Sequence, residues 1–133
     1  MGTKVQGTEV QAMNNKGYHK LLVWQKARAL VILIYQMTES FPKSEMFGLI
    51  SQMRRAAISV VLNIVEGDRR KSRKEFLRFL DMADGSLTEL EACLEIAVDL
   101  HYLNGEDLEK IDGKRKEVAS MMVGLMRSIQ KAL

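Results

Sequence analysis

The residues best suited to chemistry are five cations within six positions, namely Arg69, Arg70, Lys71, Arg73 and Lys74. Such side chains neutralise phosphate groups, and each contact releases counterions, so that binding weakens as salt is added. Three interpretations are open: binding to the backbone of RNA or DNA, binding to an acidic protein surface, or a solvated loop. No aromatic residue interrupts the cluster, so recognition of bases by stacking is not expected.

Two arginines occupy an apolar stretch ahead of this cluster. Arg54 and Arg55 should lie in mid-helix, level with the early part of the following antiparallel helix. We expect them to form structural ion pairs with Asp81, with Asp84 or with an acid of a neighbouring subunit. A role in binding a ligand is the alternative.

Two further polar residues close the same stretch. Asn63, together with Ser59, should fix the register of two packed helices, as a single polar group does in coiled coils. Glu66 lies near the end of its helix, where the helix dipole disfavours a carboxylate. We therefore expect Glu66 to pair with Arg69 or Arg70, in a structural rather than a catalytic role.

Metal and catalytic sites are not expected. One cysteine and two histidines cannot complete a zinc site within one subunit. Neither histidine follows a glutamate by three residues, which is the spacing that di-iron bundles use. No set of nucleophile, base and orienting group can be assembled either. We expect no metal, no cofactor and no enzymatic activity.

Size and composition predict one cytoplasmic domain. The chain has 133 residues, 47% of them hydrophobic, which is typical of a globular protein. The longest apolar run, from Leu30 to Tyr35, is too short to span a bilayer, and we recognise no signal peptide. Residues 1–19 lack periodicity and should form a flexible arm, whereas residues 20–133 should form the helical domain.

Charge is segregated along the chain. The net charge is +3, yet residues 54–78 hold eight basic and three acidic groups. Residues 81–112, by contrast, hold ten acidic groups and a single basic one, Lys110. The position of the charge is therefore more informative than its sum.

Apolar residues at three- and four-residue spacing predict four helices. The first should end at Pro42, and the second should begin at an N-cap, Ser44, and end at Gly67. The third should begin at a capping box of Ser72 and Glu75, and the fourth should follow a turn at residues 104–105. The apolar positions of the third helix form a heptad pattern: Phe76, Leu80, Ala83, Leu87, Leu90, Leu94, Ala97 and His101.

Short connections between these helices imply an all-α, up-down-up-down antiparallel four-helix bundle. In that topology the link between the second and third helices lies at the same end as the chain's C-terminus. We expect a basic pole there, where Lys20 and Arg127 support the cluster. The opposite pole should be acidic.

Several motifs resemble a known bacterial family of four-helix bundle proteins, which is encoded within intervening sequences of 23S ribosomal RNA genes. The resemblance covers residues 20–133. It is carried by Trp24-Gln25-Lys26-Ala27, the Phe41-Pro42 turn, Glu45-x-x-Gly48-Leu49, Gln52-x-Arg54-Arg55-Ala56-Ala57, Asn63-Ile64-x-Glu66-Gly67, Phe76-x-x-Phe79-Leu80, Gly85-Ser86-Leu87-x-Glu89-Leu90-Glu91 and Tyr102-Leu103. More distantly, the chain resembles the accessory variability determinants of diversity-generating retroelements.

The resemblance implies a homopentameric ring without established enzymatic activity, and the distant relatives imply contact with nucleic acid and a reverse transcriptase. Our leading hypothesis is a non-enzymatic, oligomeric bundle whose basic pole binds RNA or DNA backbone. The alternative is a protein-interaction scaffold that recruits a partner enzyme such as a reverse transcriptase. A third possibility is that the gene persists in a mobile or intervening element and contributes little to its host.

Overall fold

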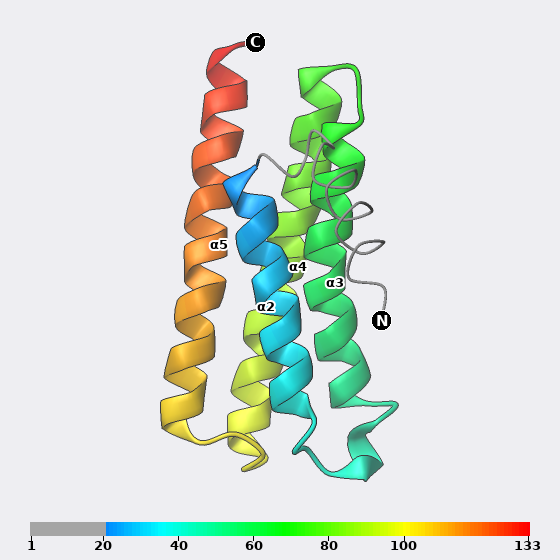
Figure 1. The fold of residues 1–133 in the computed structure, drawn as a ribbon, viewed down its shortest axis with the longest axis vertical. Helices are drawn as coiled ribbons and strands as arrows, with labels where there is room; N and C mark the ends of the chain where they lie inside the picture. The colour runs from blue at the N-terminus through cyan, green and yellow to red at the C-terminus, as the bar shows by residue number, and fades with distance from the viewer. Residues whose placement is uncertain (1–20) are drawn as a thin grey trace, which may run out of the picture.

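The computed structural model describes residues 21–133, so the arm expected over residues 1–19 and the side chain of Lys20 lie outside the described residues. The elements in chain order are α2 (Leu22–Thr38), the short 3-10 helix η2 (Lys43–Glu45), α3 (Leu49–Asp68), α4 (Arg73–Asp99) and α5 (Gly105–Lys131). Consecutive α-helices run in opposite directions (Figure 1). The predicted all-α, up-down-up-down bundle is confirmed, and residues 21–133 contain no strand.

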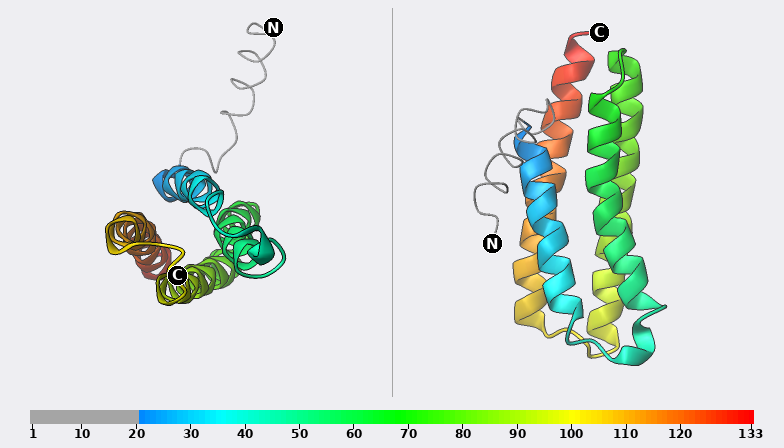
Figure 2. Two further views of the ribbon diagram at one scale, coloured as in Figure 1. Left: turned by 90° about the horizontal axis from the view of Figure 1, so that it is seen from below. Right: turned by 45° about the vertical axis from the view of Figure 1, so that its right-hand side comes forward.

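The helices surround one core, with each helix packed against two neighbours and with α3 and α4 in the most extensive contact. The view along the bundle in Figure 2 shows this arrangement, with α2 diagonally opposite α4. Each helix buries one stripe, because its apolar residues recur at three- and four-residue spacing. The most deeply buried large side chains include Leu30, Ile34, Met53, Ile64, Leu80, Leu87, Leu90, Leu94 and Met122.

The start of the second long helix differs from the prediction. Ser44 lies in η2 rather than capping a helix, and α3 begins five residues later at Leu49. The side chain of Glu45, four residues earlier in the sequence, caps α3 instead. Its Oε1 accepts a hydrogen bond from the Leu49 N–H (3.2 Å). Its Oε2 accepts from the hydroxyl of Tyr102 (2.8 Å), which ties this turn to the α4–α5 connection.

Gly67 does not end α3 by adopting a left-handed conformation. It lies inside α3, and no glycine of the described part has a positive φ. A Cβ atom at this position would lie 2.8 Å from Phe76 Cδ1 and 2.9 Å from Phe79 Cβ. Gly67 therefore allows the end of α3 to approach the start of α4 closely.

The end of α4 is a Schellman motif with His101 in the left-handed conformation (φ 62°). The N–H of Tyr102 donates to the carbonyl of Ala97, and the N–H of His101 to that of Val98, both at 2.9 Å. The predicted heptad pattern is buried from Leu80 to Ala97, but His101 at its end is exposed.

No helix within residues 21–133 has an apolar stretch long enough to cross a bilayer.

Candidate nucleic-acid interface at the α3–α4 end of the bundle

The basic cluster occupies the connection between α3, which ends at Asp68, and α4, which begins at Arg73. Ser72 caps α4, because its Oγ accepts a hydrogen bond from the N–H of Glu75 (3.0 Å). Figure 1 shows this connection at the same end of the bundle as the C-terminus of α5. The side chains of the cluster are exposed there.

Two of the five cluster cations have structural partners. Arg70 forms an ion pair with Glu66 (3.5 Å) and lies over the ring of Phe79, 4.7 Å from its centroid. Arg73 donates a hydrogen bond to the carbonyl oxygen of Ala132 (3.1 Å), which attaches the end of α5 to the start of α4. These two arginines therefore hold the end of the bundle together.

The other three cluster cations project from the connection without such partners. Within residues 21–133, Arg69, Lys71 and Lys74 form no ion pair. Arg127 is likewise exposed near the end of α5. Four cations of the basic pole, Arg69, Lys71, Lys74 and Arg127, therefore have no ion pair within residues 21–133. Unpaired cations on one surface favour the binding of an anion, because no internal carboxylate must first be displaced.

A groove of about 500 Å³ separates the start of α4 from the end of α5. Its lining includes two cations, Lys74 and Arg78, and two acids, Glu75 and Asp81. Arg78 donates to Glu75 (2.8 Å), and this hydrogen bond, with the positive charge of Arg78, lowers the pKa of Glu75 below its usual value. The groove is therefore balanced in charge, and phosphates are better accommodated at the connection above it.

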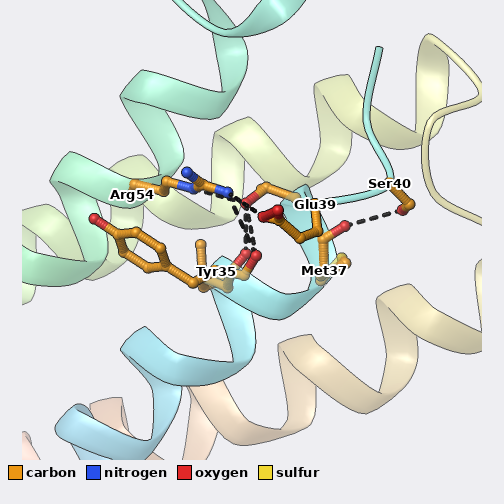
Figure 3. A network of polar contacts seen from close by, with 7 residues as sticks. Tyr35, Met37, Glu39, Ser40 and Arg54 are labelled. Atoms are coloured by element: carbon orange, nitrogen blue, oxygen red, sulfur yellow. Dashed lines mark hydrogen bonds and ion pairs between the residues drawn. The ribbon is translucent and has the colours of Figure 1, made fainter. Parts of the chain in front are cut away.

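Arg54 makes different contacts from those predicted. Its Nε donates to Thr38 Oγ1 (2.9 Å), and its Nη2 lies 3.3 Å from Glu39 Oε2 (Figure 3). The guanidinium also lies over the ring of Tyr35, 4.4 Å from its centroid. The expected pair with Asp81 or Asp84 is wrong. Because α2 has no basic residue in its last turn, Arg54 supplies the cation that its C-terminal end favours.

The remaining polar residues predicted as structural occupy local positions on α3 and α4. Arg55 is exposed and donates to Gln52 Oε1 (2.7 Å), not to an acid of α4. Asp84 forms no ion pair within residues 21–133, so its expected pairing with either arginine is wrong as well. Glu66 pairs with Arg70, one of its two expected partners.

Asn63 takes part in a polar chain between α3 and α4. Its Nδ2 donates to the carbonyl oxygen (2.9 Å) and to the Oγ (3.1 Å) of Ser59. Ser59 Oγ also accepts from Ser86 Oγ of α4 (3.0 Å). Only the bond between Ser86 and Ser59 crosses from α4 to α3, and Asn63 holds Ser59 from within α3, so Asn63 supports the register of the two helices indirectly.

One buried arginine, Arg115, is not among the residues predicted from the sequence. Its Nε contacts Asp112 Oδ1 (2.6 Å) and its Nη2 contacts Glu91 Oε2 of α4 (2.9 Å). The spacing of α5 could have revealed it, because Arg115 falls between Ile111 and Val118 in the buried stripe. Burial alone would raise the pKa of Asp112, but the hydrogen bond and charge of Arg115, followed by those of Lys116, lower it.

No grouping of three or more His, Cys, Asp or Glu side chains within residues 21–133 could hold a metal ion. Cys93 is buried in the core, and that burial, with the nearby charge of Glu89, raises the pKa of its thiol. A raised pKa keeps the thiol protonated and poorly nucleophilic. Cys93 is therefore a core residue of the bundle.

Comparisons with known proteins identify the fold and the family of this chain. No curated protein matches the chain. A crystal structure of a protein of unknown function from the S23 ribosomal protein family of Bacteroides thetaiotaomicron has the same fold, with a TM-score of 0.74 and 23% identity over 79% of this chain and 98% of that one. The family of 23S rRNA-intervening sequence proteins matches residues 19–124. Since this match covers most of the chain, the protein belongs to the 23S rRNA-intervening sequence protein family.

Proposed function

We propose that this protein is a cytoplasmic, non-enzymatic, oligomeric bundle that binds the backbone of RNA or DNA through its basic pole. The observation that carries the proposal is the exposure of Arg69, Lys71 and Lys74 together, without ion pairs among the described residues. The description of the family names 23S rRNA but no activity. Since that description assigns no ligand, the proposal rests on the exposed charge of the pole.

Contacts to the backbone, rather than to bases, fit the surroundings of the pole. Phe79 is buried beneath Arg70, and Phe76 is partly buried against the core. Neither ring is therefore available as a platform on which bases could stack. Lysine and arginine contacts to phosphates position a nucleic acid without reading its sequence. Binding should accordingly depend strongly on salt and weakly on sequence.

The test is a titration of the full chain with a fluorescent structured RNA and with a duplex DNA, at about 50 and 200 mM salt. The informative variant is the double substitution Lys71→Gln/Lys74→Gln, because neither side chain has an ion pair to lose within residues 21–133. Each lost phosphate contact should lower the salt slope by about 1, so the double variant should lose up to about 2.

The matched control is Lys43→Gln/Lys114→Gln, which removes the same charge from exposed lysines away from the pole that likewise form no ion pair within residues 21–133. It should retain the salt slope and most of the affinity of the parent. Equal losses of affinity in both double variants would show that binding depends on the net charge of the protein and not on the position of the pole. Absence of salt-dependent binding in the parent would refute the proposal.

We further propose that the chain self-associates through an apolar patch at the opposite end. Phe47 is 98% exposed beside a groove of about 400 Å³ that Tyr35, Ile50 and Ile58 help to line. Arg55 borders the same groove. Aromatic residues and arginine are the types enriched in the buried centres of protein interfaces.

The outward face of α4 offers a complementary surface on a second copy. Exposed Ile96 and Leu100 lie there beside the exposed carboxylates of Glu95 and Asp99. Both surfaces lie toward the same end of the bundle, since α3 begins where α4 ends (Figure 1). Contact between two different faces generates a ring when the rotation closes. The homopentamer that the family resemblance implies is one such ring.

Sedimentation velocity of the parent and of Phe47→Ser tests self-association. The parent should sediment as an oligomer, and Phe47→Ser should shift it toward the monomer. Val123→Ser is the control, because it removes an exposed apolar side chain from α5. A monomeric parent would exclude self-association and would favour the second candidate function, a scaffold whose exposed patch recruits a partner enzyme such as a reverse transcriptase.

A further inference from the structure

A third groove lies on the flank of the bundle between α2 and α5. Its volume is about 250 Å³, and α2 supplies its apolar floor with Ala29, Leu30 and Leu33. Ile32 lines the same groove and is 54% exposed. The groove extends along α2 from Lys26 to Gln36, which corresponds to about 15 Å of helix.

The charge of this groove is unbalanced, unlike that of the groove beside Lys74. Lys26 is paired with Glu117 across the groove (3.4 Å), so this cation and this acid offset each other. Lys110 and Lys114 also line the groove, and neither has an ion-pair partner within residues 21–133. They lie one turn apart on α5, and like charges at this spacing repel each other.

Lys110 is also the only basic residue in the acidic stretch 81–112. At the groove it lies beside Lys114, the first residue of the basic run Lys114-Arg115-Lys116 that follows the acidic stretch, so two unpaired cations meet at an apolar surface. A partner that supplies carboxylates along the α5 side would relieve their repulsion. The α2 side of the groove offers it apolar surface instead.

We propose that this groove binds an acidic amphipathic helix of a partner protein. The volume is small for a whole drug-sized ligand, but it suits two or three apolar side chains of a helix laid along it. About 15 Å corresponds to three turns, which present anchors at positions i, i+3 or i+4, and i+7. Glutamates along one edge of that helix would face Lys110 and Lys114. Its leucine side chains would pack over Ile32.

The chemistry of the groove distinguishes this partner from nucleic acid. A phosphate backbone would place charge over the exposed side chain of Ile32 and over the leucines of the floor, where it gains nothing. The site is therefore independent of the basic pole, and it stands or falls separately from nucleic-acid binding.

The test is fluorescence polarisation of the full chain with a labelled helical peptide that carries leucine at i, i+3 and i+7 and glutamate along one edge. A peptide with lysine in place of each glutamate is the matched probe. The acidic peptide should bind at least tenfold more tightly than the basic one. Lys110→Glu/Lys114→Glu should weaken its binding at least tenfold, and Ile32→Ser should weaken it several-fold.

Lys71→Glu/Lys74→Glu at the basic pole is the charge-matched control and should leave peptide binding unchanged, because neither lysine lines this groove or forms an ion pair within residues 21–133. Hydrogen exchange should show protection of residues 26–36 and 110–117 when the peptide is bound. Equal affinity for the two peptides would overturn the proposal, and so would loss of binding only in the basic-pole variant. If Lys110→Glu/Lys114→Glu dissociates the oligomer instead, the groove is covered by a second copy and the proposal fails.

Discussion

His101 is the residue whose backbone conformation is least suited to its type. It adopts φ 62° at the position that follows the end of α4, where glycine is the usual residue. A side chain in this conformation crowds the following carbonyl oxygen. The Schellman hydrogen bonds of His101 and Tyr102 hold it there despite that crowding.

Replacement of His101 by glycine should therefore stabilise the protein. We expect a gain of about 0.5–1 kcal/mol in the free energy of unfolding, since the relief of crowding exceeds the entropy that glycine loses on folding. Urea denaturation measures it. His101→Ala retains the crowding and should show no such gain. If His101→Ala stabilises the protein as much as His101→Gly, the imidazole and not the backbone conformation is the source of the destabilisation.

Arg115 carries a buried charge that two acidic partners, Asp112 and Glu91, stabilise. Its replacement by methionine keeps the packing of the stem but removes two charge-assisted hydrogen bonds, to Asp112 and Glu91. We expect a loss of about 1.5–3 kcal/mol at neutral pH. The neighbouring Lys116→Met is the control and should change stability by less than about 0.5 kcal/mol, because Lys116 is 70% exposed.

This loss should depend on pH in a defined direction. The pKa of Asp112 in the folded protein lies below its ordinary value of 3.8. Its ionised form therefore stabilises the fold fully above that value, and the contribution disappears as the pH falls through the folded pKa. The difference in stability between the parent and Arg115→Met should shrink in the same range. A difference that stays constant down to acid unfolding would assign the role of Arg115 to packing alone.

Residue contacts were only partly predictable from sequence, and the reason is geometric. The spacing of α5 contained the information that Arg115 lies in the buried stripe, whereas the partner of Arg54 could not be deduced. That partner depends on where α3 begins relative to the end of α2. Arg54 lies on the side of α3 that faces α2, and because η2 delays the start of α3 to Leu49, it is level with Thr38 and Glu39 at the end of α2.

At the scale of the elements, the connections determine how closely the helices approach. Helix number, direction and buried stripes were predictable because 3.6-residue periodicity is a property of the sequence itself. The cap of α3 was not, because Glu45 lies four residues before Leu49 and is held by Tyr102 from the other connection. A tertiary contact of this kind leaves no local signal.

Gly67 provides the test at this scale, because it sets the distance between α3 and α4. Gly67→Ala should destabilise the protein by about 1–3 kcal/mol, since the new Cβ would clash with Phe79 Cβ. Gly113→Ala is the matched control, because a Cβ there meets nothing within 4 Å. That substitution should stabilise α5 by up to about 1 kcal/mol. Thermal unfolding of both variants compares them, and a stabilised Gly67→Ala would contradict the close approach.

At the scale of the whole molecule, the bundle separates a basic pole from a patch suited to self-association at the other end. The two proposals are coupled, because an assembly that joins copies through the Phe47 patch presents several basic poles together. Linked poles bind one nucleic acid more tightly than a single pole does, since the later contacts form within one complex. The number of phosphates contacted, and with it the salt slope, rises in the same way.

Phe47→Ser should therefore weaken nucleic-acid binding although it removes no charge. We expect an affinity at least about a hundredfold lower than that of the parent, together with a shallower salt slope. Lys71→Gln/Lys74→Gln should weaken binding while the oligomer stays intact, so the two variants separate charge from assembly. Measurement of mass and affinity on the same samples decides the matter. If Phe47→Ser is monomeric yet binds with the parent's affinity and slope, one pole is sufficient and the assembly serves another purpose.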